Sequence, residues 1–108
     1  MPTLRSLLGG PDIPLNHPTV LVGRHPACDA KIDSRVVSLR HCILSQDADE
    51  FVVIELESTN GTWINGRRVE RGRLKPGDEM AIGRMRYRVE GAPEHQTTAI
   101  LFRCPSGQ

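Results

Sequence analysis

Short apolar runs separated by turn-forming residues recur along this chain. Residues 85–90 (MRYRVE) alternate, with apolar side chains at the odd positions and charged ones at the even positions. This period of two is typical of a strand with one buried face. Residues 51–56 form a nearly continuous apolar run, in which we expect Val52, Ile54 and Leu56 to face the interior. Similar short runs occupy residues 20–22, 42–44 and 80–82.

Turn-forming residues mark the boundaries of these runs. They gather at residues 9–12, 16–18, 46–49, 65–66 and 76–78. No window of about 12 residues sustains an apolar period of 3.6, so helices are not expected. Strands of about five residues at intervals of about ten predict an all-β domain, either a sandwich or a barrel. We place this single domain at residues 1–91, followed by a linker and C-terminal tail at residues 92–108.

Two Asn-Gly pairs lie within nine residues, at 58–66 (STNGTWING). Asn65-Gly66 separates two β-prone runs, residues 62–64 and 67–69, and this pattern predicts a hairpin with a type I′ turn. Asn60-Gly61 instead follows the run at 51–56. It belongs to a polar loop that either binds a ligand or caps its own backbone through short side chains.

Composition narrows the range of functions. The chain has 108 residues and a net charge of +1, which argues against a protein that neutralises many nucleic-acid phosphates. Lys31 and Lys75 are the two lysines, so twelve of the fourteen basic residues are arginine, the residue favoured for bidentate anion contacts. Aromatic residues make up 4% of the chain, too few to favour a base-stacking surface. The sequence lacks a signal peptide and a membrane-length apolar stretch, and we expect a cytoplasmic protein.

The cysteines do not form a metal or disulfide pattern. Cys28, Cys42 and Cys104 are odd in number and lack CxxC spacing, so no disulfide framework follows. His25 and Cys28 form one HxxC pair, but a second pair at ligand spacing is missing. We therefore expect neither a metal nor another cofactor.

Three segments that border the apolar runs carry the chemistry. Gly23-Arg24 ends one run, Ser38-Leu39-Arg40-His41 precedes the next, and residues 58–66 follow the third. The order Gly-Arg, Ser-x-x-His, Asn-Gly-Thr, Asn-Gly, at these spacings, resembles the forkhead-associated (FHA) domain over about residues 20–90. The resemblance implies a two-sheet antiparallel β-sandwich of short strands, FHA/SMAD-like, that recognises phosphothreonine in partners of Ser/Thr-kinase signalling.

A phosphate monoester carries about −1.5 to −2 charges and three strong acceptor oxygens, so it suits an arginine fork, a hydroxyl and backbone N–H groups. The resemblance assigns the fork to Arg24, a hydroxyl donor to Ser38, and a hydrogen bond to the ligand's main chain to Asn60. The full set of expected phosphopeptide-binding residues is Arg24, Ser38, Arg40, Thr59, Asn60 and Gly61. The expected structural support of the site is Gly23, His41, Asn65 and Gly66.

Leu39 departs from the family pattern, which usually has a polar or basic residue after the serine. A leucine side chain cannot donate, and losing one charge-assisted hydrogen bond, about 1.5 to 3 kcal/mol, weakens binding roughly ten- to hundredfold. If residue 40 lies on a strand, the Arg40 side chain points away from the phosphate. In an irregular loop, Arg40 or Arg35 can supply the phosphate contact that Leu39 lacks. The alternative is an FHA-like scaffolding domain that binds unphosphorylated protein partners.

Other functions have weaker support. Ser38 and His41 raise a hydrolase alternative, but the chain lacks a Gly-x-Ser-x-Gly elbow, and we do not expect an enzyme. Arginines at 67, 68, 71 and 73 suggest nucleic-acid binding, but they follow a hairpin turn, and we expect them to form a solvated rim. We expect a monomer that binds neither nucleic acid nor membrane.

The tail at residues 92–108 offers a further hypothesis. Thr97 and Thr98 each have an aliphatic residue, Ile100 or Leu101, three positions later. FHA domains often discriminate at the third position after the phosphothreonine, so a phosphorylated tail can act as a ligand of its own domain. The alternative is that this segment is a last strand or a linker remnant.

Overall fold

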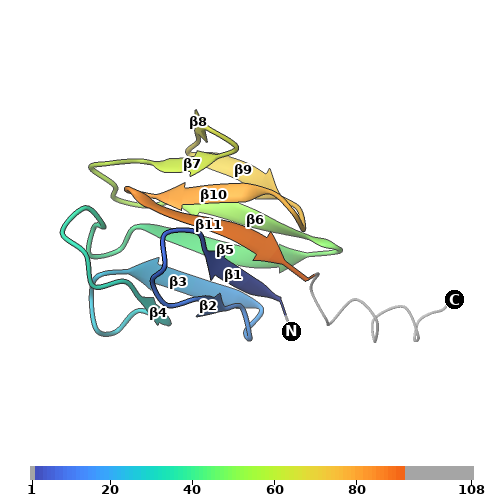
Figure 1. Ribbon diagram of the computed structural model, residues 1–108, viewed down its shortest axis with the longest axis horizontal. Coiled ribbons are helices and arrows are strands. Elements are labelled where there is room, and N and C mark those ends of the chain that lie inside the picture. Colours follow the sequence, from blue (N-terminus) through green and yellow to red (C-terminus); the bar gives the residue numbers. More distant parts are fainter. Residues whose placement is uncertain (1, 92–108) are drawn as a thin grey trace, which may run out of the picture.

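The computed structural model describes residues 2–91, which form a sandwich of two β-sheets (Figure 1). The strands are β1 (Thr3–Ser6), β2 (Ile13–Pro14), β3 (Thr19–Gly23), β4 (Ala30–Lys31), β5 (Cys42–Asp47), β6 (Glu50–Glu55), β7 (Thr62–Ile64), β8 (Arg67–Arg68), β9 (Arg71–Leu74), β10 (Glu79–Ile82) and β11 (Met85–Glu90). Within these residues we find no helix with the length and apolar character needed to cross a membrane.

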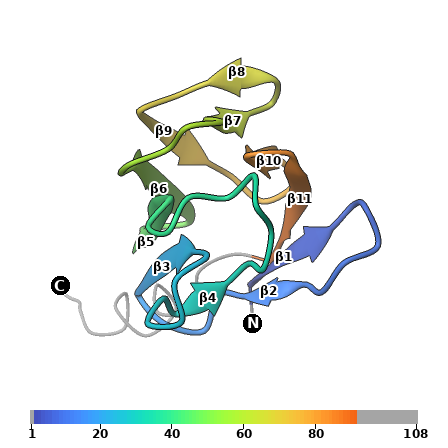
Figure 2. The same cartoon turned by 90° about the vertical axis from the view of Figure 1, so that its left-hand side faces the viewer.

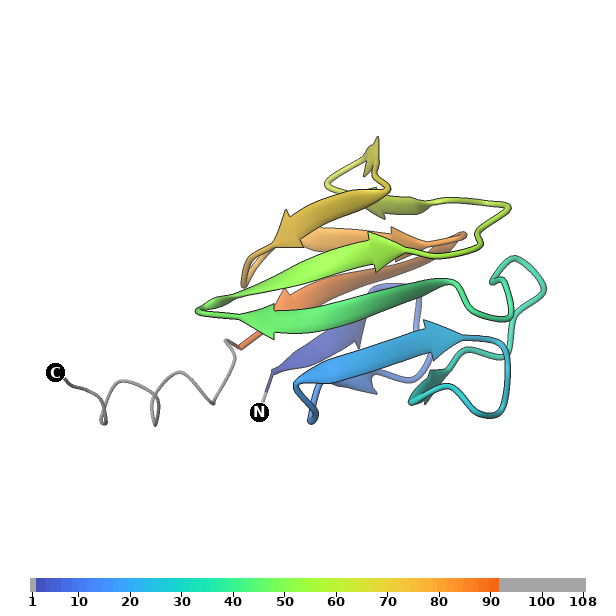
Figure 3. The ribbon, with the colours of Figure 1, turned by 180° about the vertical axis from the view of Figure 1, so that it is seen from behind.

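The two sheets confirm the expected all-β sandwich. One has the order β2-β1-β11-β10-β7-β8, and the other, seen from behind in Figure 3, has the order β4-β3-β5-β6-β9. Strand pairs are antiparallel with one exception, since β3 and β4 pair in parallel through Val22 with Ala30. β4 contributes only two residues to this pairing.

The alternation of buried and exposed side chains in β11 shows which face of the strand lines the core. Tyr87 and Val89 are buried, whereas Arg86, Arg88 and Glu90 are exposed, as the period of two predicts. The same pattern holds in β3 and β10, so apolar side chains of both sheets meet between the layers. The largest of the fully buried side chains are Phe51, Leu4, Leu15, Leu44, Leu74, Met80 and Ile82.

The prediction of which face of β6 is buried is wrong. Phe51 and Val53 are buried, Val52 and Ile54 are half-buried, and Leu56 lies beyond the strand with 40% of its surface exposed. In a run that is apolar on both faces, periodicity does not determine which face turns inward. Phe51 determines it, because the largest side chain of the strand packs into the core opposite Leu74 of β9.

The hairpin at Asn65-Gly66 is confirmed. Ile64 of β7 pairs with Arg67 of β8, which leaves a two-residue loop, and φ is 50° at Asn65 and 84° at Gly66. Positive φ at both central residues is the signature of a type I′ turn. Asn65 also ties the turn to β10, because its Oδ1 accepts a hydrogen bond from the Glu79 amide at 3.0 Å.

We expect Gly66→Ala to lower the free energy of unfolding by about 1 kcal/mol, because an L-residue is strained at this φ. A Cβ at Gly66 meets nothing within 4 Å, so backbone strain is the whole effect. Gly10→Ala is the matched control, since Gly10 lacks a positive φ and an added Cβ there makes ordinary contacts. Urea denaturation measures both variants, and equal losses would contradict the type I′ assignment.

Candidate functional site

Three segments meet at one end of the sandwich, the end that faces the viewer in Figure 2. They are the end of β3, the connection between β4 and β5, and the loop between β6 and β7. The Arg24 amide donates to the Ser38 carbonyl at 3.0 Å, and the Thr59 amide donates to the Ser38 hydroxyl at 3.2 Å. Ser38 therefore joins all three segments, and the structure brings the predicted motifs together.

Gly23 allows the first two segments to approach. A Cβ at this position would lie 2.2 Å from the Leu39 carbonyl oxygen, a distance that no side chain tolerates. The same carbonyl accepts hydrogen bonds from the His25 amide at 3.1 Å and the Cys28 thiol at 3.3 Å. The backbone of Leu39 is thus held against β3, which positions the preceding Ser38.

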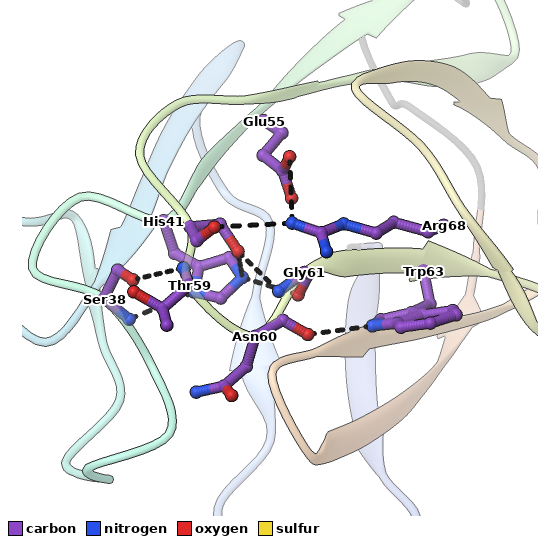
Figure 4. A network of polar contacts seen from close by, with 9 residues as sticks. Ser38, His41, Glu55, Thr59, Asn60, Gly61, Trp63 and Arg68 are labelled. Carbon is purple, nitrogen blue, oxygen red and sulfur yellow. Dashed lines mark hydrogen bonds and ion pairs between the residues drawn. The ribbon is translucent and has the colours of Figure 1, made fainter.

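His41 lies at the centre of the site and is fully buried (Figure 4). Its Nδ1 accepts a hydrogen bond from the Ser38 amide at 3.1 Å. Its Nε2 lies 2.8 Å from the Gly61 carbonyl oxygen and 3.0 Å from the Ser58 hydroxyl. One imidazole therefore links the Ser38 segment to the β6–β7 loop.

These contacts determine the protonation of the imidazole. The Ser38 N–H can only donate, so Nδ1 is unprotonated and the proton lies on Nε2, which donates to Gly61. Burial lowers the pKa of His41 from its ordinary 6.5, while the Gly61 carbonyl and the Glu55 carboxylate oppose this shift. The neutral ring is the form that holds both loops.

Arg24 extends from the end of β3 into solvent. Its Nε donates to the Val37 carbonyl at 3.0 Å, which orients the guanidinium and leaves both terminal nitrogens to donate elsewhere. Among residues 2–91 no carboxylate forms an ion pair with Arg24. The side chain thus presents a fixed, unneutralised fork of the kind that binds carboxylate or phosphate.

Ser38 and Asn60 both keep polar capacity beside this fork. The Ser38 hydroxyl accepts from the Thr59 amide, so its own hydrogen can donate to an anion. Asn60 donates through Nδ2 to the Val36 carbonyl at 2.9 Å, and this bond directs its Oδ1 to accept from a main-chain N–H. The Thr59 side chain is exposed next to them.

Gly61 permits close packing within the loop. Its φ is 92°, and a Cβ there would lie 2.8 Å from Nε1 of Trp63 and 3.0 Å from Nε of Arg68. Its amide donates to the Ser58 hydroxyl at 2.7 Å, so the loop also caps its own backbone. The structure thus shows the self-capping that one interpretation of the first Asn-Gly pair predicts.

Arg40 lies in a turn before β5 rather than on the strand. It is exposed. Burial raises the pKa of Cys28, and the positive charge of Arg40 opposes this shift. The Leu39 side chain is half exposed beside Arg40.

Arg68 is a site residue that we expected to be part of a solvated rim. Its Nη2 donates to the Ser58 carbonyl at 3.4 Å and lies 3.9 Å from the Glu55 carboxylate, of which 9% is exposed (Figure 4). Its Cδ and Nε also pack against Gly61. Position 68 carried no sequence signal for this role, because the contact depends on the hairpin folding back under the loop.

Asn65 and Gly66, expected to support the site, form the predicted hairpin turn, and two hydrogen bonds join Asn65 to Glu79 of β10. Trp63, which the sequence did not indicate as a site residue, contacts the β6–β7 loop directly. Its indole Nε1 donates to the Asn60 carbonyl at 3.1 Å and holds the tip of the binding loop.

Neither described cysteine offers a reactive thiolate to a ligand. Cys28 and Cys42 are free and buried, and burial raises the pKa of Cys42 to about 12. In the described part of the chain, no three side chains of the metal-ligating types cluster. Cys104, Thr97 and Thr98 lie outside the described residues.

The geometry does not assemble a nucleophile and a base. Ser38 meets His41 through its amide rather than its hydroxyl. The Ser58 hydroxyl lies near Nε2, the nitrogen that carries the proton, so His41 cannot accept the Ser58 proton there. The arrangement instead presents hydrogen-bond donors of Arg24 and Ser38 at an exposed surface, which suits an anion.

Comparison with known proteins identifies similar sequences and structures. The FHA domain family model matches residues 20–83. The glycogen accumulation regulator GarA of Mycolicibacterium smegmatis is 40% identical over 72 residues, which cover 67% of this chain and 46% of that protein. This chain spans about half the length of the curated relatives it matches.

Solved structures give the same result. The FhaA FHA domain, crystallised with the intracellular domain of Rv3910, is 26% identical with a TM-score of 0.74, and the match covers 83% of this chain and 100% of that chain. A structure from an analysis of phosphothreonine-dependent FHA domain interactions is 28% identical with a TM-score of 0.76. That match covers 85% of this chain and 97% of the other.

We expect NMR titration to give His41 a pKa below 6.5, because burial disfavours the charged ring. The unfolded chain then binds a proton that the folded chain does not, so the free energy of unfolding falls as pH drops below about 6.5. Glu55→Gln removes a charge that raises this pKa and should lower it further. A pKa above 6.5, or an upward shift in Glu55→Gln, would contradict the hydrogen-bonding scheme.

Proposed function

This chain belongs to the FHA domain family, and we propose that it is a phosphothreonine-peptide-binding interaction module in Ser/Thr-kinase signalling. One observation carries the proposal: the guanidinium of Arg24, the hydroxyl of Ser38 and the amide of Asn60 converge at one exposed end of the sandwich, with their internal bonds already made. Phosphothreonine dependence is described for a related structure at 28% identity and supports the same ligand here.

Each group has a distinct role in this proposal. Arg24 binds two phosphate oxygens through its terminal nitrogens, and Ser38 donates its hydroxyl hydrogen to the phosphate. Asn60 binds the ligand's main chain through Oδ1, while Thr59 and Gly61 line the same surface. The groups are pre-organised, so little ordering entropy opposes binding.

Leu39 does not remove the pocket, because its backbone carbonyl is what anchors the segment to β3. Its half-exposed side chain supplies an apolar contact to the partner instead of a phosphate contact. Arg40 lies in a turn, so its guanidinium is free of the alternation that a strand would impose. We assign to Arg40 the additional charge opposite the phosphate.

The alternative function is scaffolding through unphosphorylated partners, which the apolar side chain of Leu39 at the site favours. We further propose that the domain is a non-enzymatic, cytoplasmic monomer without a cofactor. The matched family is a binding module, and GarA is named as a regulator, which agrees with a non-enzymatic role.

Nucleic acid is a less favoured ligand than a phosphopeptide, because carboxylates neutralise part of the rim formed by the arginines at 67, 68, 71 and 73. Arg73 pairs with Asp47 at 2.8 Å and with Glu50 at 3.2 Å, and Arg68 faces Glu55. Binding to DNA would fall steeply with salt, whereas phosphopeptide recognition requires the phosphate itself.

We expect isothermal titration with a degenerate phosphothreonine peptide pool to show binding that Arg24→Ala weakens at least about a hundredfold, since two charge-assisted hydrogen bonds are lost. Matched phosphoserine and unphosphorylated pools should bind weakly or not at all. Arg71→Ala is the control, because Arg71 is exposed and has no ion pair among residues 2–91.

Binding of the unphosphorylated pool that survives Arg24→Ala would favour the scaffolding function. No binding of any pool by the wild-type chain would contradict the phosphothreonine proposal.

The phosphorylated tail is a second proposed ligand, and the fold indicates how it would bind. β11 leads away from the site (Figure 1). It begins after the Gly83 turn, which contacts Gly61 of the site, and it ends at Glu90, next to the end of the described residues. The six residue-to-residue steps from Gly91 to Thr97 span at most about 22 Å, and retracing β11 alone takes about 17 Å. Binding to a second copy of the chain is therefore easier than binding to the same copy.

We expect a chain phosphorylated at Thr97 or Thr98 to form dimers or longer assemblies by analytical ultracentrifugation, with a concentration dependence that binding within one copy would not show. Arg24→Ala and the Thr97→Ala, Thr98→Ala double variant should both remain monomeric. If the phosphorylated chain binds an external phosphopeptide as tightly as the unmodified chain does, the tail is not a ligand.

A further inference from the structure

A hollow of about 430 Å³ opens on the outer face of the six-stranded sheet. Its lining residues are Trp63, Asn65, Gly66, Glu79, Ala81, Gly83, Arg84 and Arg86. We refer to this hollow as the Trp63 groove. It contains none of the residues expected to bind phosphate.

The groove follows from one row of cross-strand neighbours. Trp63 of β7 pairs with Ala81 of β10, which pairs with Arg86 of β11. The residues on either side of Ala81, Met80 and Ile82, are buried in the core, so this row points outward. Ala81 is small, and the long side chains of its two neighbours therefore stand on either side of a depression.

Trp63 gives this depression an apolar wall. The indole is half-buried, and it is the only tryptophan of the chain. Tryptophan is enriched among residues that dominate binding energy, because it buries a large rigid surface. An apolar side chain of a partner can pack between the indole and the Ala81 methyl group.

The groove is continuous with the proposed phosphothreonine site. The Trp63 indole donates to the Asn60 carbonyl at 3.1 Å, and the Gly83 amide donates to the Gly61 carbonyl at 3.0 Å. The loop that holds the ligand's main chain therefore also borders the groove. A ligand that continues from Asn60 toward Trp63 would therefore reach the groove.

The charge around the groove is positive. Glu79 accepts hydrogen bonds from Arg86 at 2.9 Å and Arg88 at 3.1 Å, so both of its oxygens are occupied. Arg84 is exposed at the rim and has no ion pair among residues 2–91. An acidic side chain of the partner would complement this excess of arginine.

We propose that the Trp63 groove is a second docking surface for the phosphothreonine partner, which receives a bulky apolar side chain adjacent to an acidic one on the segment that continues from the phosphothreonine. The inference rests on the proposed function and adds the sequence preference that the phosphate pocket alone does not supply. The groove and the pocket together define a longer recognition element.

The test is a phosphothreonine peptide library randomised at about five positions on either side, a reach of about 16 Å in each direction. The groove variants are Ala81→Leu, which fills the depression from the outer face, and Arg84→Gln. Their controls on the other sheet are Ser45→Leu and Arg71→Gln. Trp63 is left intact because its indole holds Asn60, and thermal melts verify that each variant is folded.

The wild-type chain should select a bulky apolar residue next to Asp or Glu, at positions on one side of the phosphothreonine. Ala81→Leu should abolish the apolar preference and weaken the selected peptide about tenfold. Arg84→Gln should remove the acidic preference. A peptide truncated to the phosphothreonine and its immediate neighbours should bind all variants and controls equally.

Two results would overturn the inference while leaving the phosphate pocket in place. One is Arg24-dependent binding without any preference beyond the immediate neighbours, and the other is unchanged selection by Ala81→Leu. Absence of phosphothreonine binding in the wild-type chain would overturn the proposed function itself and the groove with it.

Discussion

The hydrogen bonds of one buried imidazole determine the arrangement of the binding loops. His41 joins the Ser38 amide to the Gly61 carbonyl and the Ser58 hydroxyl, and so links the Ser38 segment to the β6–β7 loop about 20 residues later in the chain. Each of these polar groups would be costly to bury without a partner, and a neutral histidine satisfies them because it both donates and accepts. The ring must stay neutral for this, and burial favours the neutral form. The site is thus as rigid as the core that surrounds His41.

Close backbone contacts also hold the segments of the site together. Gly23 lets the Leu39 carbonyl approach β3, and Gly83 lets the β10–β11 turn approach the Val36 carbonyl, where a Cβ would lie 2.3 Å away. Beneath the β6–β7 loop, Arg68 faces the Glu55 carboxylate, whose Oε2 is buried and lacks a hydrogen-bond partner among the described residues. That carboxylate is a destabilising feature by itself, and the positive charge of Arg68 beneath the loop offsets part of this cost. Residues that never meet a ligand therefore determine where Arg24 and Asn60 lie.

The sequence predicts the features that depend on local rules and misses those that depend on tertiary contact. The Asn65-Gly66 turn follows from the φ values that only such a pair adopts easily, and β11 follows from strict alternation. Short strands such as β1, β2 and β4 were not predicted, since two to four residues with mixed polarity become strands only beside a partner. The phase of β6 was predicted wrongly because both of its faces are apolar. Ordered motifs located the site segments, but the position of Arg68 beneath them requires the folded hairpin.

The distribution of ion pairs separates the arginines that serve the fold from those available to a partner. Arg73, Arg86 and Arg88 form ion pairs with carboxylates of nearby strands. Arg24 and Arg84 have no such pairing within residues 2–91. Arg24 lies beside the Ser38 segment, and Arg84 follows Gly83, whose amide donates to the Gly61 carbonyl of the β6–β7 loop. A chain with a net charge of +1 thus keeps unneutralised cations near this loop. Since exposed charges act only over about a Debye length, roughly 10 Å, a partner must present its own anions close to these side chains to benefit from them. The positions of the unpaired arginines, rather than the net charge of the chain, therefore set the charge pattern that a partner has to match.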